Sequence, residues 1–546
     1  MSLTKTGTAD STAKPAIHGT TADVELQAGA VSPVTGHADE LRREFSVWSL
    51  GALLVCLMAT WEALSSVVAQ ALTNGGAPCL FYNYIIAFIG TLLTAASLAE
   101  IASIYPTAGG QYHWVASLAP SHTRLVASWF TGWINIGGQV VLTASAAFAA
   151  GLQFQALIVL NDVSGTYVPQ RWQGMMFYWA VIAYSTAINI YGSRILPHTN
   201  TLSGIGHVVG FVAVVLVLGI MGIGEEGGHS ASYVFKDVNN TSGWSNDGVS
   251  WMVGLLSAVY PFLGYDAAAH LAEELPNPSR SVPIAMIGSI VVNGLMGLVY
   301  CLVLLFALGD LSSLLASPTG FPFIQLFLNV THSRAGATVL ALFISLVAVA
   351  ANAAGTTSTS RTAWAFARDG AAPCSAYFAR VDPRSQVPLR MVLATSALQA
   401  ALGLVYLASA TAFNAVLSMA VLGMYASYIL PVAYMLAYGR RRTDHSSSSS
   451  SPVKGEEEVT TEKIAPAFTL GAWGPWVNAA SVAWLAVAMV FSTFPSVRPV
   501  TPQNMNYSVV VLGGWVAAGA VYYFGWARRW YEGPVVVVVV EDGFGS

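Results

Sequence analysis

Twelve apolar runs, each long enough to cross a lipid bilayer as a helix, constrain the fold of this chain more than any other feature. A spanning helix needs about 20 mostly apolar residues, and every backbone polar group in it must pair within the protein. The runs cover residues 46–70, 79–104, 124–150, 172–193, 200–222, 249–272, 284–308, 336–359, 389–409, 412–438, 472–494 and 507–527. The sequence therefore predicts an all-α membrane protein with twelve transmembrane helices.

The composition supports this fold class and argues against several functions. Only 9% of the residues are charged, whereas soluble domains carry about 25%. The four cysteines are scattered without metal-ligand spacing, and no basic stripe indicates a nucleic-acid partner. No nucleophile motif or phosphate-binding loop stands on an inner segment, so we expect neither an enzyme nor a cofactor or metal site.

Polar segments divide the chain. Residues 1–45 are rich in Ser, Thr, Ala and Gly and predict a disordered cytosolic tail. Residues 439–470 contain RRRTDHSSSSSSPVKGEEE, which indicates a flexible cytosolic loop or, alternatively, a phosphorylation or sorting segment. Residues 471–530 hold the last two spans, and 531–546 form a C-terminal tail with a run of six valines that has no physical explanation here.

The basic residues predict the orientation in the membrane. With the N-terminus inside, nineteen of the 23 Lys and Arg fall on the inner side; the exceptions are Arg171, Lys236, Arg334 and Arg498. Four Asn-x-Ser/Thr sequons fall on the outer side and are predicted glycosylation sites: Asn239, Asn240, Asn329 and Asn506. Both termini are therefore expected in the cytosol, in the plasma membrane by default or in a vacuolar membrane.

Two spans carry residues that a continuous apolar helix would avoid. The run 249–272 contains Pro261, Gly264 and Asp266, and the first run contains Glu62 at its middle. A carboxylate near the bilayer centre costs a few kcal/mol and usually has a function. Paired interruptions predict an inverted repeat with a site at mid-membrane, here in helices 1 and 6. The alternatives are a proline kink with Asp266 at a wet boundary, and a structural glutamate that faces the bundle.

Four motifs carry a family resemblance. They are ATWEALSSVVAQALTNGGAP (59–78), AEIASIYPTAGGQYHWVASLAP (99–120), YPFLGYDAAAHLAEELPNPSRSVPIAM (260–286) and SRTAWAFARDGAAP (360–373). The sequence resembles the fungal amino acid/choline permeases, which include GABA and choline permeases, of the amino acid–polyamine–organocation superfamily. The resemblance covers about residues 45–530. It implies the leucine-transporter fold, with a first repeat at 46–222 (helices 1–5) and a second at 249–438 (helices 6–10).

The two interruptions define a candidate substrate site. One wall would hold Ala59, Thr60, Trp61, Glu62 and Ala63, and the other would hold Phe262, Leu263, Gly264, Tyr265 and Asp266. Free N–H groups at the start of an inner half-helix suit a substrate carboxylate, and freed carbonyls of an outer half suit an ammonium. Aromatic rings among these residues (Trp61, Phe262 and Tyr265) can cover a cationic head group, or simply pack the bundle.

Proton coupling and gating have their own candidates. Glu62 can serve as counter-ion or proton carrier, and His207 in helix 5 belongs to the residue type that changes charge near neutral pH. Bacterial relatives carry a lysine in this helix, which this sequence lacks. At the inner boundary we expect gate ion pairs between Glu273 or Glu274 and Arg361 or Arg368.

The predicted function is therefore secondary active transport, as a proton symporter that imports a small amine or amino acid such as GABA or choline. The partners are that substrate, protons and the bilayer. The alternative is a non-transporting amino-acid sensor on the same scaffold, which would usually carry larger cytosolic extensions.

Overall fold

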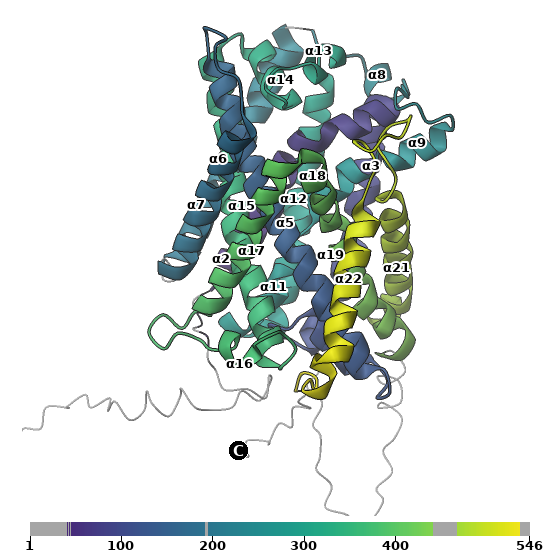
Figure 1. The fold of residues 1–546 in the computed structure, drawn as a ribbon. Coiled ribbons are helices and arrows are strands. Elements are labelled where there is room, and N and C mark those ends of the chain that lie inside the picture. Colours follow the sequence, from purple (N-terminus) through teal and green to yellow (C-terminus); the bar gives the residue numbers. More distant parts are fainter. Residues whose placement is uncertain are drawn as a thin grey trace, which may run out of the picture.

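A computed structural model describes residues 41, 43, 45–191, 195–225, 227–439 and 467–535 (Figure 1). The predicted N-terminal tail up to residue 40, the loop residues 440–466 and the tail from residue 536 lie outside the described residues. Every regular element of the described part is a helix, so the prediction of a helical protein is confirmed.

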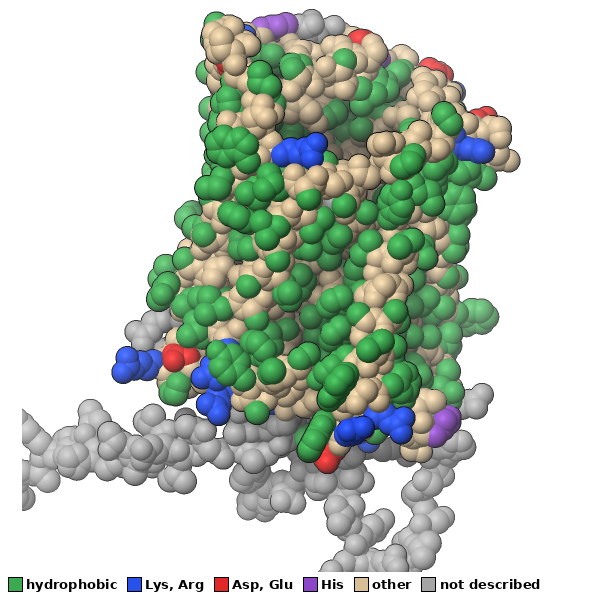
Figure 2. Space-filling model, viewed as in Figure 1, with side chains coloured by type: hydrophobic (Ala, Val, Ile, Leu, Met, Phe, Trp, Pro, Cys, Tyr) green, Lys and Arg blue, Asp and Glu red, His purple; other side chains and the backbone are tan. Residues whose placement is uncertain are grey.

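Long helices run side by side and form one bundle. They are α2 (Val47–Met58), α3 (Thr60–Ile104), α5 (Arg124–Asn161), α6 (Arg171–Tyr191), α7 (Leu196–Val217), α12 (Pro278–Phe306), α15 (Arg334–Arg368), α17 (Leu389–Ala408), α18 (Ala410–Leu417), α19 (Met419–Tyr434), α21 (Gly474–Phe491) and α22 (Ser508–Gly525). Within the described residues, ten helical segments are long and apolar enough to cross a membrane. Figure 2 shows the matching surface, with apolar side chains along the height of the bundle and Lys and Arg gathered near its two ends.

Short helices mark the two ends of the bundle, which we name after them. The α14 end, at the top of Figure 1, carries α8 (Ala231–Phe235), α13 (Leu311–Leu315) and α14 (Pro322–Thr331). The α16 end, at the bottom, carries α16 (Ser375–Phe378). Near the α16 end, α4 (Gln111–Leu118) packs against α5 and α19.

The first span is interrupted between α2 and α3. Ala59 has a left-handed backbone, with φ 42° and ψ 49°, and it ends α2 and starts α3. The helix α3 is 45 residues long but bends at Gly76, where φ is 75° and ψ is −161°. The segment Val47–Ile104 therefore contains two of the predicted apolar runs.

The span around 249–272 is a series of short pieces. It consists of α9 (Asp247–Val253), α10 (Leu256–Val259), the 3-10 turn η2 (Tyr260–Phe262), α11 (Ala267–His270) and the 3-10 turn η3 (Ala272–Glu274). Leu263 is extended, with φ −78° and ψ 148°, and Gly264 has φ +105°. Pro261 cannot donate a backbone hydrogen bond, and glycine readily adopts positive φ. The chain is thus broken at this point rather than only kinked.

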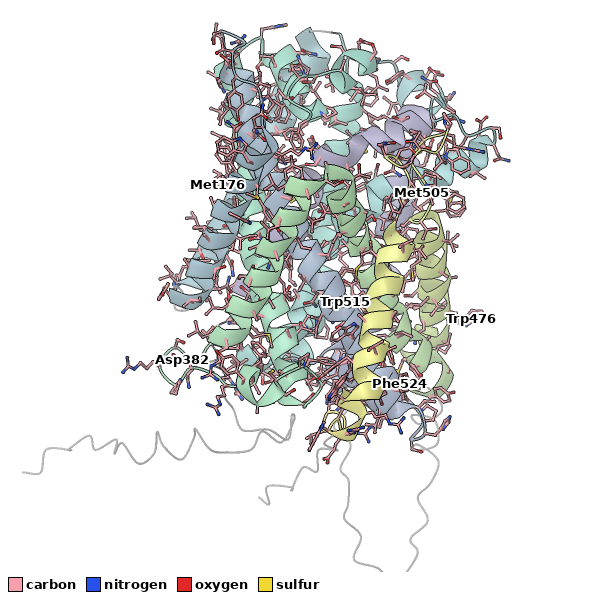
Figure 3. The ribbon with its side chains drawn as sticks, viewed as in Figure 1. Met176, Asp382, Trp476, Met505, Trp515 and Phe524 are labelled. Atoms are coloured by element: carbon pink, nitrogen blue, oxygen red, sulfur yellow. The ribbon has the colours of Figure 1, made fainter. Side chains whose placement is uncertain are left out.

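Aromatic packing fixes the last helix against the bundle. The rings of Trp133 on α5 and Trp515 on α22 stack with centroids 4.6 Å apart, and each indole N–H donates to the other residue's carbonyl. In Figure 3, Trp515 lies at the middle of α22, whereas Trp476 on α21 points away from the bundle. Trp476 is 74% exposed, as expected for a ring at a membrane interface.

Candidate functional site

A cavity of about 390 Å³ lies beside both breaks. Its wall comes from six parts of the chain that are distant in sequence: Leu57, Met58, Ala59, Glu62, Ala63, Ser66, Val67, Leu142, Thr143, Ser145, Ala146, Phe148, Ala149, Leu152, Gln153, Tyr260, Leu263, Phe321, Ile344, Ala348, Ala351, Asn414 and Leu417. The volume lies in the range of small-molecule sites, which are mostly apolar with a few polar groups. Among these lining residues Glu62 is the only charged one, so the cavity offers a single fixed negative charge.

The structure separates the predicted site residues into three sets. Ala59, Glu62, Ala63 and Leu263 line the cavity. Gly264 and Asp266 instead border a much smaller space of about 10 Å³, which shares Leu57, Leu142 and Thr143 with the cavity. The remaining four, Thr60, Trp61, Phe262 and Tyr265, are buried and line neither space.

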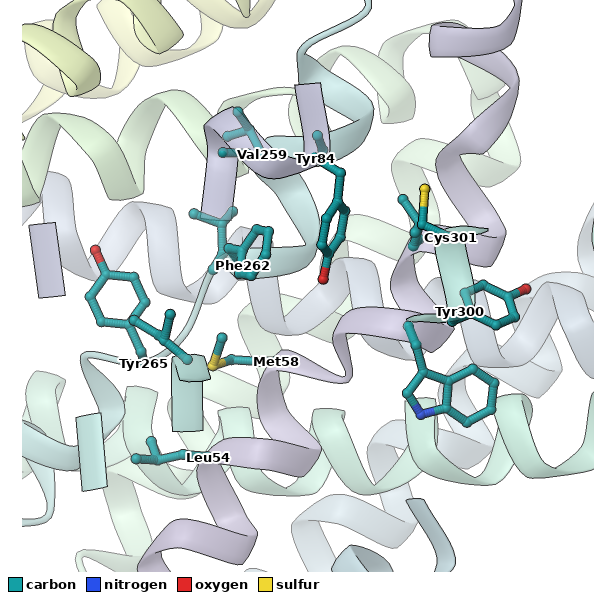
Figure 4. Close-up of a cluster of buried hydrophobic side chains, with 14 of the residues drawn as sticks. Leu54, Met58, Tyr84, Val259, Phe262, Tyr265, Tyr300 and Cys301 are labelled. Atoms are coloured by element: carbon teal, nitrogen blue, oxygen red, sulfur yellow. The ribbon is translucent and has the colours of Figure 1, made fainter. Parts of the chain in front are cut away.

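The aromatic residues of the prediction lie behind the cavity wall. The Trp61 ring packs against Tyr300, His207 and Phe211, with centroids 5.4, 6.0 and 6.2 Å away. The Phe262 ring packs on Tyr84, with centroids 5.2 Å apart, and Figure 4 shows these two rings next to one another. Neither ring reaches into the cavity, so in this conformation they support its walls.

Glu62 is bound to the other proton-coupling candidate. Its Oε1 lies 2.7 Å from Nδ1 of His207, and both side chains are almost fully buried. The remaining polar atoms, Oε2 of Glu62 and Nε2 of His207, have no hydrogen-bond partner among the described residues. At 2.7 Å a proton must lie between Oε1 and Nδ1, and it can reside on either atom. The pair therefore shares a proton between two buried side chains, and its carboxylate also lines the cavity.

The breaks also supply backbone dipoles. The helix α3 starts at Thr60, and Ala63 N–H is the first of its amides to donate along the chain, to Ala59 O at 2.7 Å. The N–H groups of Thr60, Trp61 and Glu62 thus have no acceptor within the helix. On the other span, η2 ends at Phe262, and the Pro261 carbonyl accepts a hydrogen bond from Thr60 Oγ1 at 2.9 Å. The N-terminal end of α3, with its partial positive charge, and the C-terminal end of η2, with its partial negative charge, therefore lie beside Glu62.

Asp266 belongs to a separate polar cluster on the α16 side of the cavity. Its carboxylate accepts hydrogen bonds from Gln111 Nε2 and Tyr428 Oη, both at 2.7 Å, and from Gln139 Nε2 at 3.5 Å. His270 Nδ1 lies 3.0 Å from the Ala108 carbonyl, and its Nε2 lies 2.8 Å from Gln139 Nε2. The same Nε2 lies 3.3 Å from Oδ2 of Asp266, so His270 is part of the cluster. The cluster ties α4, α5, α11 and α19 together.

Two ion pairs lie further toward the α16 end, where gate contacts were predicted. Glu273 pairs with Arg368 through two hydrogen bonds of 2.8 and 2.9 Å, and Glu274 accepts one of 2.7 Å from Arg361. Burial opposes ionisation of Glu273, but the Arg368 guanidinium outweighs it and lowers the pKa of Glu273 below its ordinary value of 4.5. A lowered pKa keeps the carboxylate charged above that value, and the stabilisation is lost only as the pH falls through the lowered pKa. The Glu273–Arg368 pair is thus intact at neutral pH.

Several cavity residues were not singled out from the sequence. Tyr260 Oη and Ser145 Oγ lie 2.8 Å apart, and Gln153 Nε2 donates to Ser66 Oγ at 3.2 Å. Gln153 stands in the apolar stretch AAGLQFQAL of α5, and a polar residue inside a span is a signal that could have identified it. Phe321 and Asn414 belong to regions far along the chain, and nothing in the local sequence connects them to the site.

All four sequons lie toward the α14 end, but they differ in their contacts. Asn239 and Asn329 have exposed side chains. Asn240 Nδ2 donates to Trp244 O and Asp247 Oδ1, both at 2.9 Å, and Asn506 Nδ2 donates to Ser492 O at 2.7 Å and Phe494 O at 3.2 Å. A glycan replaces a hydrogen on this nitrogen. Asn329 Oδ1 accepts a hydrogen bond from Gln325 Nε2 at 2.8 Å, but among the described residues no hydrogen bond uses Nδ2 of Asn239 or Asn329.

Comparison with known proteins identifies the family of the chain. The family model described as amino acid permease matches residues 45–515. An uncharacterised amino-acid permease of Schizosaccharomyces pombe is 32% identical over 93% of this chain and 89% of its own length. Amino-acid permease 2 of Neurospora crassa is 30% identical over 98% and 94%, and the choline transporter of Saccharomyces cerevisiae is 29% identical over 88% and 81%. The chain therefore belongs to the amino acid permease family, whose members are membrane transporters rather than enzymes.

Proposed function

We propose that the protein is a proton symporter that imports a small amine or amino acid, of the size of GABA or choline, across the plasma membrane. One observation carries this proposal: among the described residues that line a cavity of about 390 Å³, Glu62 is the only charged one, and it is bound to a buried histidine. A single carboxylate selects a substrate that carries one ammonium group. The names of the relatives, a choline transporter and an amino-acid permease, fit the same class.

The architecture that goes with this function has twelve spans arranged as two inverted repeats. Residues 46–222 and 249–438 form the repeats, residues 439–470 form a cytosolic loop, and 471–530 form two peripheral helices. Support comes from the bend at Gly76, which divides Val47–Ile104 into two spans, and from the 21 residues of α6, enough to cross a bilayer. The breaks at Ala59 and at Leu263–Gly264 stand in the first helix of each repeat.

Substrate and proton share the site in this mechanism. A substrate ammonium binds between Glu62 and the carbonyl end of η2, and a substrate carboxylate, where there is one, binds the free N–H groups at the start of α3. The proton binds to the Glu62–His207 pair from the outside. Opening of the Asp266 cluster and of the Glu273–Arg368 and Glu274–Arg361 pairs then releases both to the cytosol at the α16 end.

Uptake measurements in a permease-deficient yeast test this function. Cells that express the chain are offered radiolabelled GABA, choline, a polyamine and the common amino acids, with and without an uncoupler. We expect saturable uptake of at least one amine or amino acid, and we expect the uncoupler to abolish it. Uptake that survives the uncoupler would refute proton coupling. No uptake of any compound by protein at the cell surface would favour the sensor.

A further inference from the structure

A second and larger cavity, of about 580 Å³, lies outside the transport site. It is enclosed by α5, α6, α7 and α15, and its lining residues are Phe154, Phe177, Ala180, Val181, Tyr184, Ile188, Leu196, Thr199, Asn200, Ser203, Leu346, Val349, Ala350 and Ala353. None of them lines the cavity beside Glu62. The helices α6 and α7 both pack on α15 but not closely on one another, which leaves this space between them.

The cavity opens sideways, toward the surface that faces lipid. Its rim includes Tyr184 on α6 and Leu346 on α15, which are 50% and 58% exposed. On the neighbouring outer face of α7, the apolar side chains of Leu202 and Ile205 are 69% and 56% exposed. A molecule can therefore enter from the bilayer without passing through water.

The polar groups of the cavity gather at one end. Thr199, Asn200 and Ser203 stand in the first two turns of α7, near the α16 end, whereas the rest of the wall is almost wholly apolar. Asn200 is 5% exposed, and its Nδ2 has no hydrogen-bond partner among the described residues. A buried amide without a partner costs about 1–3 kcal/mol. The amide is thus a hydrogen-bond donor available to a ligand.

We propose that this cavity binds a membrane sterol, with its hydroxyl group against Asn200 and its ring system between α6, α7 and α15. A sterol has one uncharged polar group at one end of an apolar body, which matches the polarity of the wall. This orientation also places the hydroxyl near the membrane boundary at the α16 end and the rings toward mid-membrane. The volume is that of a site for a drug-sized molecule.

The chemistry of the wall favours a sterol over a phospholipid. Among the described residues, no charged side chain lines the cavity, so its described wall has no cation for a phosphate head group. A rigid ring system also loses less conformational freedom on entering a preformed cavity than a flexible acyl chain does. The bound sterol would support α7, which carries His207 two turns beyond Asn200.

Photolabelling of the purified full-length protein with a diazirine sterol tests the proposal. We expect label in the peptides that contain residues 177–188 and 196–203, and we expect unlabelled sterol to compete for it. Asn200→Leu should weaken binding about tenfold, the change that corresponds to losing a hydrogen bond of ~1.4 kcal/mol. Ala350→Phe should block labelling by filling the space.

Two matched variants serve as controls. Thr201→Leu, on α7 like Asn200, and Ala187→Phe, on the neighbouring α6, place the same side chains on exposed positions and should leave labelling unchanged. Retained labelling in Ala350→Phe, label spread evenly over the lipid-facing helices, or equal competition by a phospholipid would each overturn the proposal. Thermal melting of each variant shows whether it is folded.

Discussion

Glu62 stands where the cavity, the start of α3 and His207 meet. One of its carboxylate oxygens is bound to the imidazole, and the other has no partner among the described residues. A carboxylate in this position can contact two positive partners at once, a proton shared with the histidine through one oxygen and a substrate ammonium near the other. Symport of proton and substrate would require that both are bound to Glu62 at the same time.

The variant Glu62→Gln tests the charge at nearly constant volume. Because the amide cannot balance an ammonium, we expect the loss of about 2 kcal/mol of binding, or roughly a thirtyfold lower uptake efficiency. Initial uptake rates over a range of substrate concentrations measure this loss, and surface fluorescence of a tagged protein controls for delivery. Normal transport by the variant would exclude Glu62 from the site.

The variant His207→Gln tests whether His207 takes part in proton coupling. Glutamine keeps a hydrogen-bond partner for Glu62 but does not titrate. In the wild type, uptake should rise as the external pH falls from about 8 to about 5, because the proton is a co-substrate. In the variant this dependence should flatten, while competition between unlabelled substrates stays in the same order. An unaltered pH profile would reduce His207 to a structural role.

At the scale of the element, the two helix breaks are formed by different kinds of residue. The break before α11 uses a proline and a glycine, both of which favour it locally. The break before α3 has neither, and Ala59 adopts φ 42° although alanine does not favour it. The break before α11 was therefore visible in the sequence as a helix-breaking pattern. The break before α3 was visible only as the unusual position of Glu62.

Substitution of Gly264 tests the break before α11. With φ +105°, a side chain here is strained, and its Cβ would lie 3.0 Å from Leu57 Cγ. We expect Gly264→Ala to destabilise the folded protein by about 1–3 kcal/mol. Gly288→Ala, in α12 with nothing within 4 Å of the added Cβ, should leave the stability unchanged or raise it. Melting of the two purified variants in detergent compares them, and equal melting temperatures would mean that the break tolerates a side chain.

At the scale of the whole molecule, the sequons report orientation. If the α14 end faces outward, Asn239 and Asn329 should carry glycans, because their side chains are exposed there. Asn239→Gln and Asn329→Gln should each increase gel mobility, and the double variant should no longer shift on endoglycosidase treatment. Asn506→Gln is the control, since that amide already donates two hydrogen bonds. A wild-type protein without glycans would contradict this orientation.

The sequence predicted the helical class and ion pairs of Glu273 or Glu274 with Arg361 or Arg368, because these follow from run length and from charge at helix ends. It did not predict which glutamate pairs with which arginine. It did not predict that Trp61 and Phe262 face away from the cavity, or that Asp266 pairs with Gln111 and Tyr428. The direction of a side chain in a buried span depends on helices up to hundreds of residues away. Composition does not contain this information, since all faces of such a helix are apolar.

The left-handed alanine at position 59 has one further consequence. A non-glycine residue in this region costs roughly 1–2 kcal/mol, and that energy is recovered whenever the residue returns to a right-handed or extended backbone. The junction between α2 and α3 therefore stores backbone strain in the conformation seen here. In a carrier, this strain would favour a change to another conformation, and bound substrate would have to stabilise the present one.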